Sequence, residues 1–166
     1  MHALARQPEL WNQNRLRKDY PGSPHAQCDD IWLRFQDQSE KPEGFNIDEH
    51  ECINFDAWWK LPAAKPIIFG ILHQVEGERL GRIVVTRLKP GGMIHPHADG
   101  GSPATYYERY QVALNCNPGV GFTCGSEAIE QHTGDIWWFD NTQVHGVVNN
   151  SDDDRVVMIV DVRCAR

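Results

Sequence analysis

Two histidines and one aspartate supply the residue types and the spacing of a metal site. His97 and Asp99 are two positions apart in the chain, so on a strand their side chains would point to the same face. His145 follows an aromatic segment and a turn further along. Two imidazoles and one carboxylate that leave the other metal positions open form the ligand set of non-haem iron(II) centres. We therefore predict that His97, Asp99 and His145 bind a metal ion.

Two further histidines lie close enough in sequence to be considered with this site. His95 is two residues before His97, so it would share the same strand face and could form an alternative H-x-H pair. The simpler interpretation is that His95 lines the site or lies in a loop and binds no metal. His25 follows a proline-rich turn and could reach over the mouth of the site to contact a substrate, or remain in a surface loop.

Arg155 lies ten residues after His145, beyond a turn that contains three consecutive aspartates. If this segment is a hairpin, Arg155 lies on the strand beside His145, and its planar guanidinium could bind a carboxylate through two parallel hydrogen bonds. The alternative is an exposed ion pair with Asp152, Asp153 or Asp154, which would contribute little energy.

The segments that must position these residues have the pattern of a β protein. Short β-rich runs are separated by Gly, Pro, Asn and Asp at residues 82–88, 93–99, 109–116, 121–124, 135–139, 144–149 and 156–162. This spacing predicts a sandwich or barrel. Apolar residues at helical spacing predict one helix at 65–77. We predict a single domain over 1–166, in which 1–64 form a covering layer with one strand at 31–35 and 80–164 form the catalytic core.

Composition excludes several classes of protein. The chain has 166 residues and a formal net charge of −7, with 16 Lys and Arg against 23 Asp and Glu, and no segment gathers the basic residues. General binding to nucleic acid or to an anionic membrane is therefore not expected. The apolar run at 156–160 is far shorter than the ~20 residues of a membrane-spanning helix. Five cysteines without a C-x-x-C pattern and a start without an apolar stretch predict a cytoplasmic protein.

From Leu80 to the C-terminus the sequence resembles the Fe(II)/2-oxoglutarate-dependent oxygenases, most closely the aspartyl/asparaginyl β-hydroxylase-like branch. The H-x-D element His97-Ala98-Asp99, His145 placed 48 residues after His97, and Arg155 carry the resemblance. The phrases at 109–114, 134–137, 139–141 and 160–162 are also similar to that branch. Together these elements are far more specific than a lone H-x-D.

The resemblance implies a mainly β fold, a double-stranded β-helix of the jelly-roll or cupin-like type, which agrees with the strand pattern. It implies Fe(II) held by His97, Asp99 and His145, with 2-oxoglutarate and O2 as cosubstrates. Arg155 would bind the distal carboxylate of 2-oxoglutarate and Arg109 would lie near its inner carboxylate. Gln111 shares a strand face with Arg109 and is the third residue assigned to the cosubstrate. The expected reaction hydroxylates an amino acid, a residue of a peptide or a similar small polar substrate, and releases succinate and CO2.

Two other interpretations remain open. The segment from Gly134 to Asn149 and the element His95-Pro96-His97 also resemble the metal motifs of cupins, so a metal-dependent cupin isomerase or dioxygenase that uses no 2-oxoglutarate is one alternative. A jelly roll used only for binding is the other. Arg155 and Arg109 favour the oxygenase, because such a cupin does not need a clamp for a carboxylate.

Overall fold

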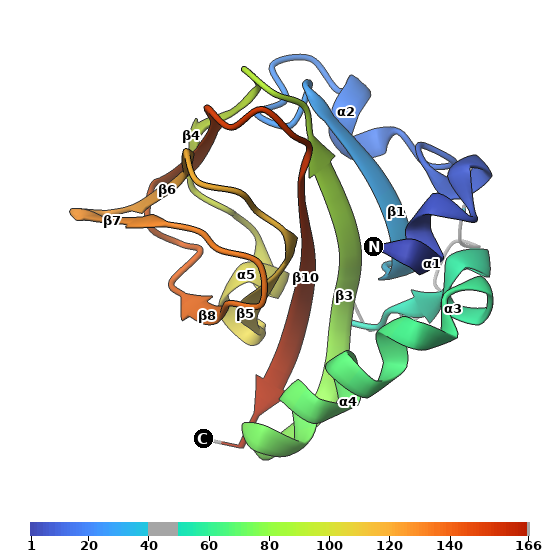
Figure 1. Ribbon diagram of the computed structural model, residues 1–166. Coiled ribbons are helices and arrows are strands. Elements are labelled where there is room, and N and C mark those ends of the chain that lie inside the picture. Colours follow the sequence, from blue (N-terminus) through green and yellow to red (C-terminus); the bar gives the residue numbers. More distant parts are fainter. Residues whose placement is uncertain (40–49, 166) are drawn as a thin grey trace.

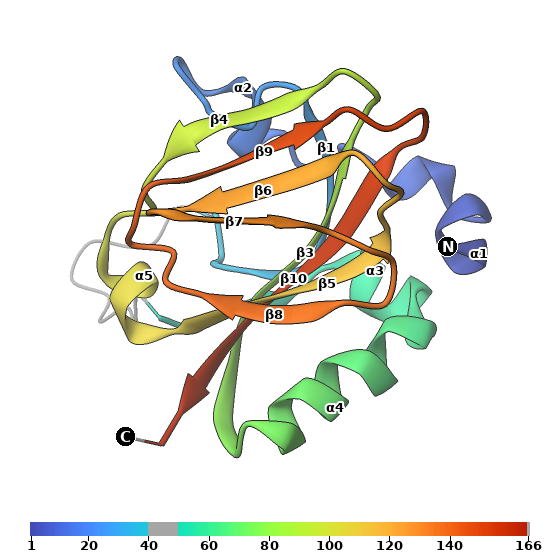
Figure 2. The same ribbon diagram turned by 60° about the vertical axis from the view of Figure 1, so that its left-hand side comes forward.

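The computed structural model describes residues 1–39 and 50–165, and its framework is two antiparallel sheets that face each other (Figures 1 and 2). The strands are β1 (Cys28–Phe35), β2 (Ile53–Asn54), β3 (Gly77–Leu88), β4 (Met93–His97), β5 (Glu108–Asn115), β6 (Val120–Cys124), β7 (Glu127–Glu130), β8 (Ile136–Phe139), β9 (His145–Asn149) and β10 (Arg155–Cys164). The larger sheet has the order β2-β1-β3-β10-β5-β8, and the smaller sheet has the order β4-β9-β6-β7.

The chain passes back and forth between the two sheets. From β3 to β6 successive strands alternate between the larger and the smaller sheet, β7 stays in the smaller one, and β8 to β10 alternate again. This winding is the double-stranded β-helix, a form of jelly roll. The predicted fold class is confirmed.

The helices that lie between β2 and β3 in the chain cover the outer face of the larger sheet. The helices are α1 (His2–Ala5), α2 (Leu16–Asp19), α3 (Asp56–Lys60), α4 (Lys65–Gln74) and α5 (Ser102–Tyr106), with 3-10 turns at Pro8–Leu10 and Pro62–Ala64. Figure 1 shows α3 and α4 packed on the side of β3 and β10 that faces away from the smaller sheet. Ile68 and Ile71 of α4 are buried in this layer together with the apolar side chains of β10.

The helix predicted at 65–77 ends at Gln74. Glu76 adopts a positive φ of 51°, a left-handed conformation that an α-helix of L-residues cannot continue through. Gly77 then begins β3, where a Cβ atom would lie 2.3 Å from the side chain of Val162. Only glycine fits this turn from helix into strand.

Alternation along β10 divides its side chains between two environments. Val156, Met158, Val160 and Val162 belong to the core under the helices. Arg155 and Asp161, which have the opposite parity, point between the two sheets, where they hydrogen-bond side chains of other strands. Arg155 and Asp161 therefore lie inside the β-helix, on a strand that has a neighbour on each side in the larger sheet.

Three features differ from the sequence prediction. β7 was not predicted, because its four residues are all exposed and show no alternation of burial. β1 begins three residues before the predicted strand at 31–35 and pairs with β3, so residues of the predicted covering layer extend the larger sheet. The short helices other than α4 were not predicted either. The single domain of 1–166 with a catalytic core at 80–164 stays a prediction.

Within the described residues, no helix has both the length and the apolar character required to cross a membrane.

Candidate metal centre

A β-bulge sets the direction of the first histidine of the site. In the pairing of β4 with β9, Ile94 lies opposite Val147 and His97 lies opposite His145, so β4 contains one residue more than its partner strand in this interval. The extra residue reverses the alternation. Ile94 and His97 both point inward, whereas His95 is exposed. The prediction that His95 shares a face with His97 is therefore wrong, and the bulge is the reason.

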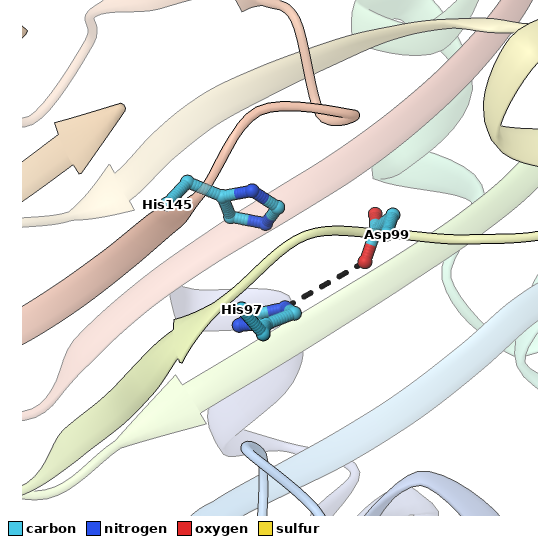
Figure 3. A group of neighbouring side chains, drawn as sticks. All are labelled: His97, Asp99 and His145. Atoms are coloured by element: carbon cyan, nitrogen blue, oxygen red, sulfur yellow. Dashed lines mark ion pairs between the residues drawn. The ribbon is translucent and has the colours of Figure 1, made fainter. Parts of the chain in front are cut away.

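His97, Asp99 and His145 come together at the ends of these two strands (Figure 3). Their potential ligand atoms all lie within 4.8 Å of one another, and His97 Nε2 lies 3.6 Å from Asp99 Oδ1. Among the described residues this is the group of His, Cys, Asp or Glu that could hold a metal ion. Two imidazoles and a carboxylate on one side of an ion suit an iron(II) centre with open positions.

Backbone carbonyls orient both imidazole rings. His97 Nδ1 lies 2.8 Å from the carbonyl of His95, and His145 Nδ1 lies 2.9 Å from the carbonyl of Gln143. Each Nδ1 therefore carries the hydrogen and donates it, which leaves the lone pair of Nε2 available for a metal. His97 Nε2 is buried without any hydrogen-bond partner, as expected for an atom reserved for an ion. Burial also lowers the pKa of His145, which favours the neutral, ligating form.

The carboxylate of Asp99 is held so that one oxygen remains for a metal. Arg109 Nη1 and Asn141 Nδ2, the latter at 3.0 Å, both donate to Asp99 Oδ2. Oδ1 is the oxygen that faces His97. Burial alone would raise the pKa of Asp99, but Arg109 and Asn141 outweigh it and hold the pKa below its ordinary value. Asp99 is therefore ready to act as an ionised ligand through a single oxygen.

Arg109 lies between two carboxylates of the chain. Its Nε and Nη2 donate to Asp161 at 2.7 and 2.8 Å, while Nη1 donates to Asp99. Burial opposes the charge, but the two aspartates outweigh it and raise the pKa of Arg109. The sequence predicted that Arg109 would lie near the inner carboxylate of a cosubstrate. In the structure its side chain supports Asp99, and its place near a cosubstrate stays a prediction.

Sequence reasoning did not assign roles to Asp161 and Asn141. Asp161 is 2% exposed and Asn141 is 4% exposed. A signal for Asp161 was available in the sequence, because it is an isolated acidic residue next to an apolar run and a buried charge needs a partner. Asn141 gave no comparable signal, because an asparagine after a strand is also a common turn residue.

We expect Asp161→Asn to weaken metal binding although Asp161 does not touch the metal group. The change removes one of the two carboxylates that hold Arg109, so Arg109 and hence Asp99 lose their fixed positions. Loss of such outer partners costs ~10 to 100-fold in metal affinity, and loss of one of the two carboxylates paired with the buried Arg109 should lower the free energy of unfolding by about 3 kcal/mol. Fe(II) titration and denaturant unfolding measure both effects. The exposed Asp152→Asn is the control, and equal effects of the two variants would contradict the proposed support.

Arg155 is a buried cation without an acidic partner among the described residues. It is 1% exposed, and its Nε and Nη2 donate to the amide oxygens of Gln131 at 2.8 Å and Gln111 at 3.1 Å. Nη1 is buried and has no hydrogen-bond partner. Burial lowers the pKa of Arg155 to about 10, so the group is still charged at neutral pH. An unpaired buried charge is costly, and a bound anion would compensate it.

The prediction that Arg155 and His145 lie on neighbouring strands is wrong. β9 belongs to the smaller sheet and β10 to the larger sheet, so the two residues lie in different sheets. The side-chain amide of Asn149 fixes the segment that carries the chain from β9 to β10, because it donates to the carbonyls of Leu88 and Asp153, both at 2.9 Å. The ion pair with the preceding aspartates is not formed either, since Asp154 pairs with lysine and arginine of other segments.

The N-terminal segment reaches the metal group through His25. The ring of His25 lies 4.8 Å from that of His97, edge to face, and the carbonyl of Pro24 accepts the backbone N–H of His95 at 3.2 Å. Arg17 contacts the His25 ring at 3.2 Å and pairs with Asp30 at 2.9 Å. His25 therefore lies beside the metal group, and its contact with a substrate stays a prediction.

Comparison with known proteins gives a family match over most of the chain. Residues 30–164 match the family model described as aspartyl/asparaginyl beta-hydroxylase. No curated protein matches. A predicted oxalate decarboxylase from Thermotoga maritima has 17% identity over 57% of this chain and 72% of its own, with a TM-score of 0.40. A cupin domain from Bordetella pertussis has 18% identity over 55% of this chain and 88% of its own, also with a TM-score of 0.40.

Proposed function

The chain belongs to the aspartyl/asparaginyl β-hydroxylase family of Fe(II)- and 2-oxoglutarate-dependent hydroxylases, and from this premise we propose that it hydroxylates an amino acid, a residue of a peptide or a similar small polar molecule. Iron(II) bound at the site supplies the oxidising chemistry that puts one oxygen atom of O2 into a C–H bond while 2-oxoglutarate becomes succinate and CO2. His97, Asp99 and His145 would hold the iron.

The protein's own contribution is to position the reactants and to exclude water. Phe139 and Phe122 pack against His145, with ring centroids 5.0 and 6.4 Å away, and these rings keep one side of the metal group dry. Alternation along β8 buries Phe139 and exposes Trp138, so only one face of this aromatic strand contributes to the wall. His25 would lie on the side from which a substrate approaches.

Arg155 carries the proposal that the cosubstrate is 2-oxoglutarate. A dicarboxylate keto acid has one end to chelate the metal and a distal carboxylate to pair with a cation. Arg155 is buried inside the same β-helix, remains charged, and has an unused N–H donor. Guanidinium groups bind carboxylates through charge-assisted hydrogen bonds. Gln111 and Gln131 would orient Arg155, which gives Gln111 an indirect role in binding the cosubstrate.

Arg155 also separates this proposal from its alternatives. A cupin isomerase or dioxygenase without 2-oxoglutarate has no use for a buried, unpaired arginine, and neither has a jelly roll that binds no acid. Such a residue would then impose the cost of a buried charge without a compensating ligand.

Succinate release is the direct test. The protein loaded anaerobically with Fe(II) should be supplied with O2 and 2-oxoglutarate, and screened against free amino acids, short peptides and nucleosides. We expect one class of compound to stimulate succinate formation, with hydroxylated product in equal amount by mass spectrometry. An Asp99→Ala preparation controls for succinate formed without the site. Metal-loaded protein that neither binds nor consumes 2-oxoglutarate would support the cupin alternative.

A further inference from the structure

We propose that Gln131 is a second binding residue for the distal carboxylate of 2-oxoglutarate, which it would contact with its amide N–H while its amide oxygen holds Arg155. This inference rests on the proposed function, because it concerns the same cosubstrate. Gln131 was not among the residues that the sequence pattern singled out.

The segment after β7 places Gln131 inside the β-helix. Gln131 is 0% exposed, although all four residues of β7 before it are exposed. Its backbone N–H donates to the carbonyl of Val120 in the smaller sheet at 2.8 Å, and three residues later Gly134 N–H donates to Ala113 in the larger sheet at 2.8 Å. The segment thus crosses from one sheet to the other and is tied to both, so Gln131 has a fixed position.

The hydrogen bond to Arg155 determines which end of the Gln131 amide is free. Arg155 Nε donates to Gln131 Oε1 at 2.8 Å, so the oxygen is used and the NH2 group must find another acceptor. Gln131 Nε2 is buried and has no partner, and the same is true of Arg155 Nη1. Two adjoining groups therefore each keep a buried N–H donor unused, next to a positive charge that has no acidic partner among the described residues.

A carboxylate would satisfy the two unused N–H donors and the unpaired positive charge together. It carries the missing negative charge, it has only acceptors, and its two oxygens can accept from Arg155 and Gln131 together. A neutral amide at the same position would bring donors of its own and no charge. Trp137, which lies opposite Gln111 in the pairing of β5 with β8, adds a further buried indole N–H without a partner. This surplus of donors is expected of a site for an anion.

Gln131→Glu is the sharpest test, because it places a carboxylate of the protein beside Arg155. The new side chain should pair with Arg155 and compete with the cosubstrate. We expect the dissociation constant of 2-oxoglutarate on the anaerobic Fe(II)-loaded protein to rise at least about tenfold, with Fe(II) affinity unchanged. The melting temperature without 2-oxoglutarate should rise, since the buried charge is now neutralised. Gln131→Met, which removes both the donor and the acceptor, should also weaken 2-oxoglutarate binding by about tenfold.

Two control variants separate the possible outcomes. Gln74→Glu makes the same chemical change at an exposed position at the end of α4 and should alter neither measurement. Arg155→Met tests the cosubstrate site itself. If Arg155→Met weakens 2-oxoglutarate binding but Gln131→Glu and Gln131→Met do not, the role of Gln131 is refuted while the proposed function stands. If none of these variants changes the affinity, the proposed cosubstrate site is refuted as well. Should Gln131→Glu fail to fold, Gln131→Met alone decides.

Discussion

Replacement of Asp99 or His145 by alanine is expected to abolish succinate formation and to reduce Fe(II) affinity by more than about 100-fold, since each change removes one of three protein ligands. The β-helix should stay folded. His145 lies at the end of β9, and Asp99 lies beyond the end of β4, so the backbone pairing of the strands does not depend on either side chain. After Asp99→Ala, Arg109 keeps its two hydrogen bonds to Asp161 and is not left as an unpaired buried charge. Iron analysis of anaerobically purified protein and circular dichroism measure the two expectations.

His95→Ala is the matched control for these variants. The bulge in β4 turns His95 outward, and its side chain is exposed. Iron content and succinate formation should therefore remain at the level of the unchanged protein. If His95→Ala loses iron while Asp99→Ala retains it, the H-x-H ligand set of the cupin alternative would replace the triad.

The sequence predicted elements well where a periodic pattern coincided with burial. The run at 109–116 became β5 (Glu108–Asn115), and the run at 135–139 became β8 (Ile136–Phe139). In both runs successive side chains point to opposite faces of the larger sheet, and the two faces have different surroundings. β7 has no buried residue and thus left no pattern. The spacing of His97, Asp99 and His145 sufficed to predict a metal group that the structure brings together.

Long-range pairing explains what the sequence did not predict. The partner of Arg109 is Asp161, 52 residues away, and it is known only once the register of β5 against β10 is known. The five residues between β9 and β10 have the length of a hairpin turn, yet they carry the chain from one sheet to the other. The position of the bulge at His95 and Pro96 depends on the pairing of β4 with β9. Proline within a strand is typical of bulges and of edge strands, so Pro96 alone does not locate the extra residue.

We expect Arg155→Met to raise the apparent KM for 2-oxoglutarate by a factor of about 10 to 100, while iron content barely changes. Hydrogen bonds to charged groups contribute about 1.5 to 3 kcal/mol each, and ~1.4 kcal/mol corresponds to a tenfold change in affinity. Methionine keeps much of the length of the side chain but supplies neither charge nor donor. Arg155→Lys keeps the charge without the planar fork, so its KM should lie between those of the unchanged protein and of Arg155→Met.

A binding measurement without turnover makes the role of Arg155 independent of catalysis. Because a ligand stabilises the state that it binds, 2-oxoglutarate should raise the melting temperature of the unchanged protein in the presence of Fe(II) and absence of O2, and it should fail to do so at the same concentration with Arg155→Met. The 5-amide of 2-oxoglutarate lacks the distal charge, so it should bind the unchanged protein weakly. The Arg155→Met change should reduce its affinity only a little further. Equal binding of 2-oxoglutarate by both proteins would mean that the distal carboxylate does not meet Arg155. The buried, unpaired guanidinium would then need another anion, because only a negative charge compensates it at that depth.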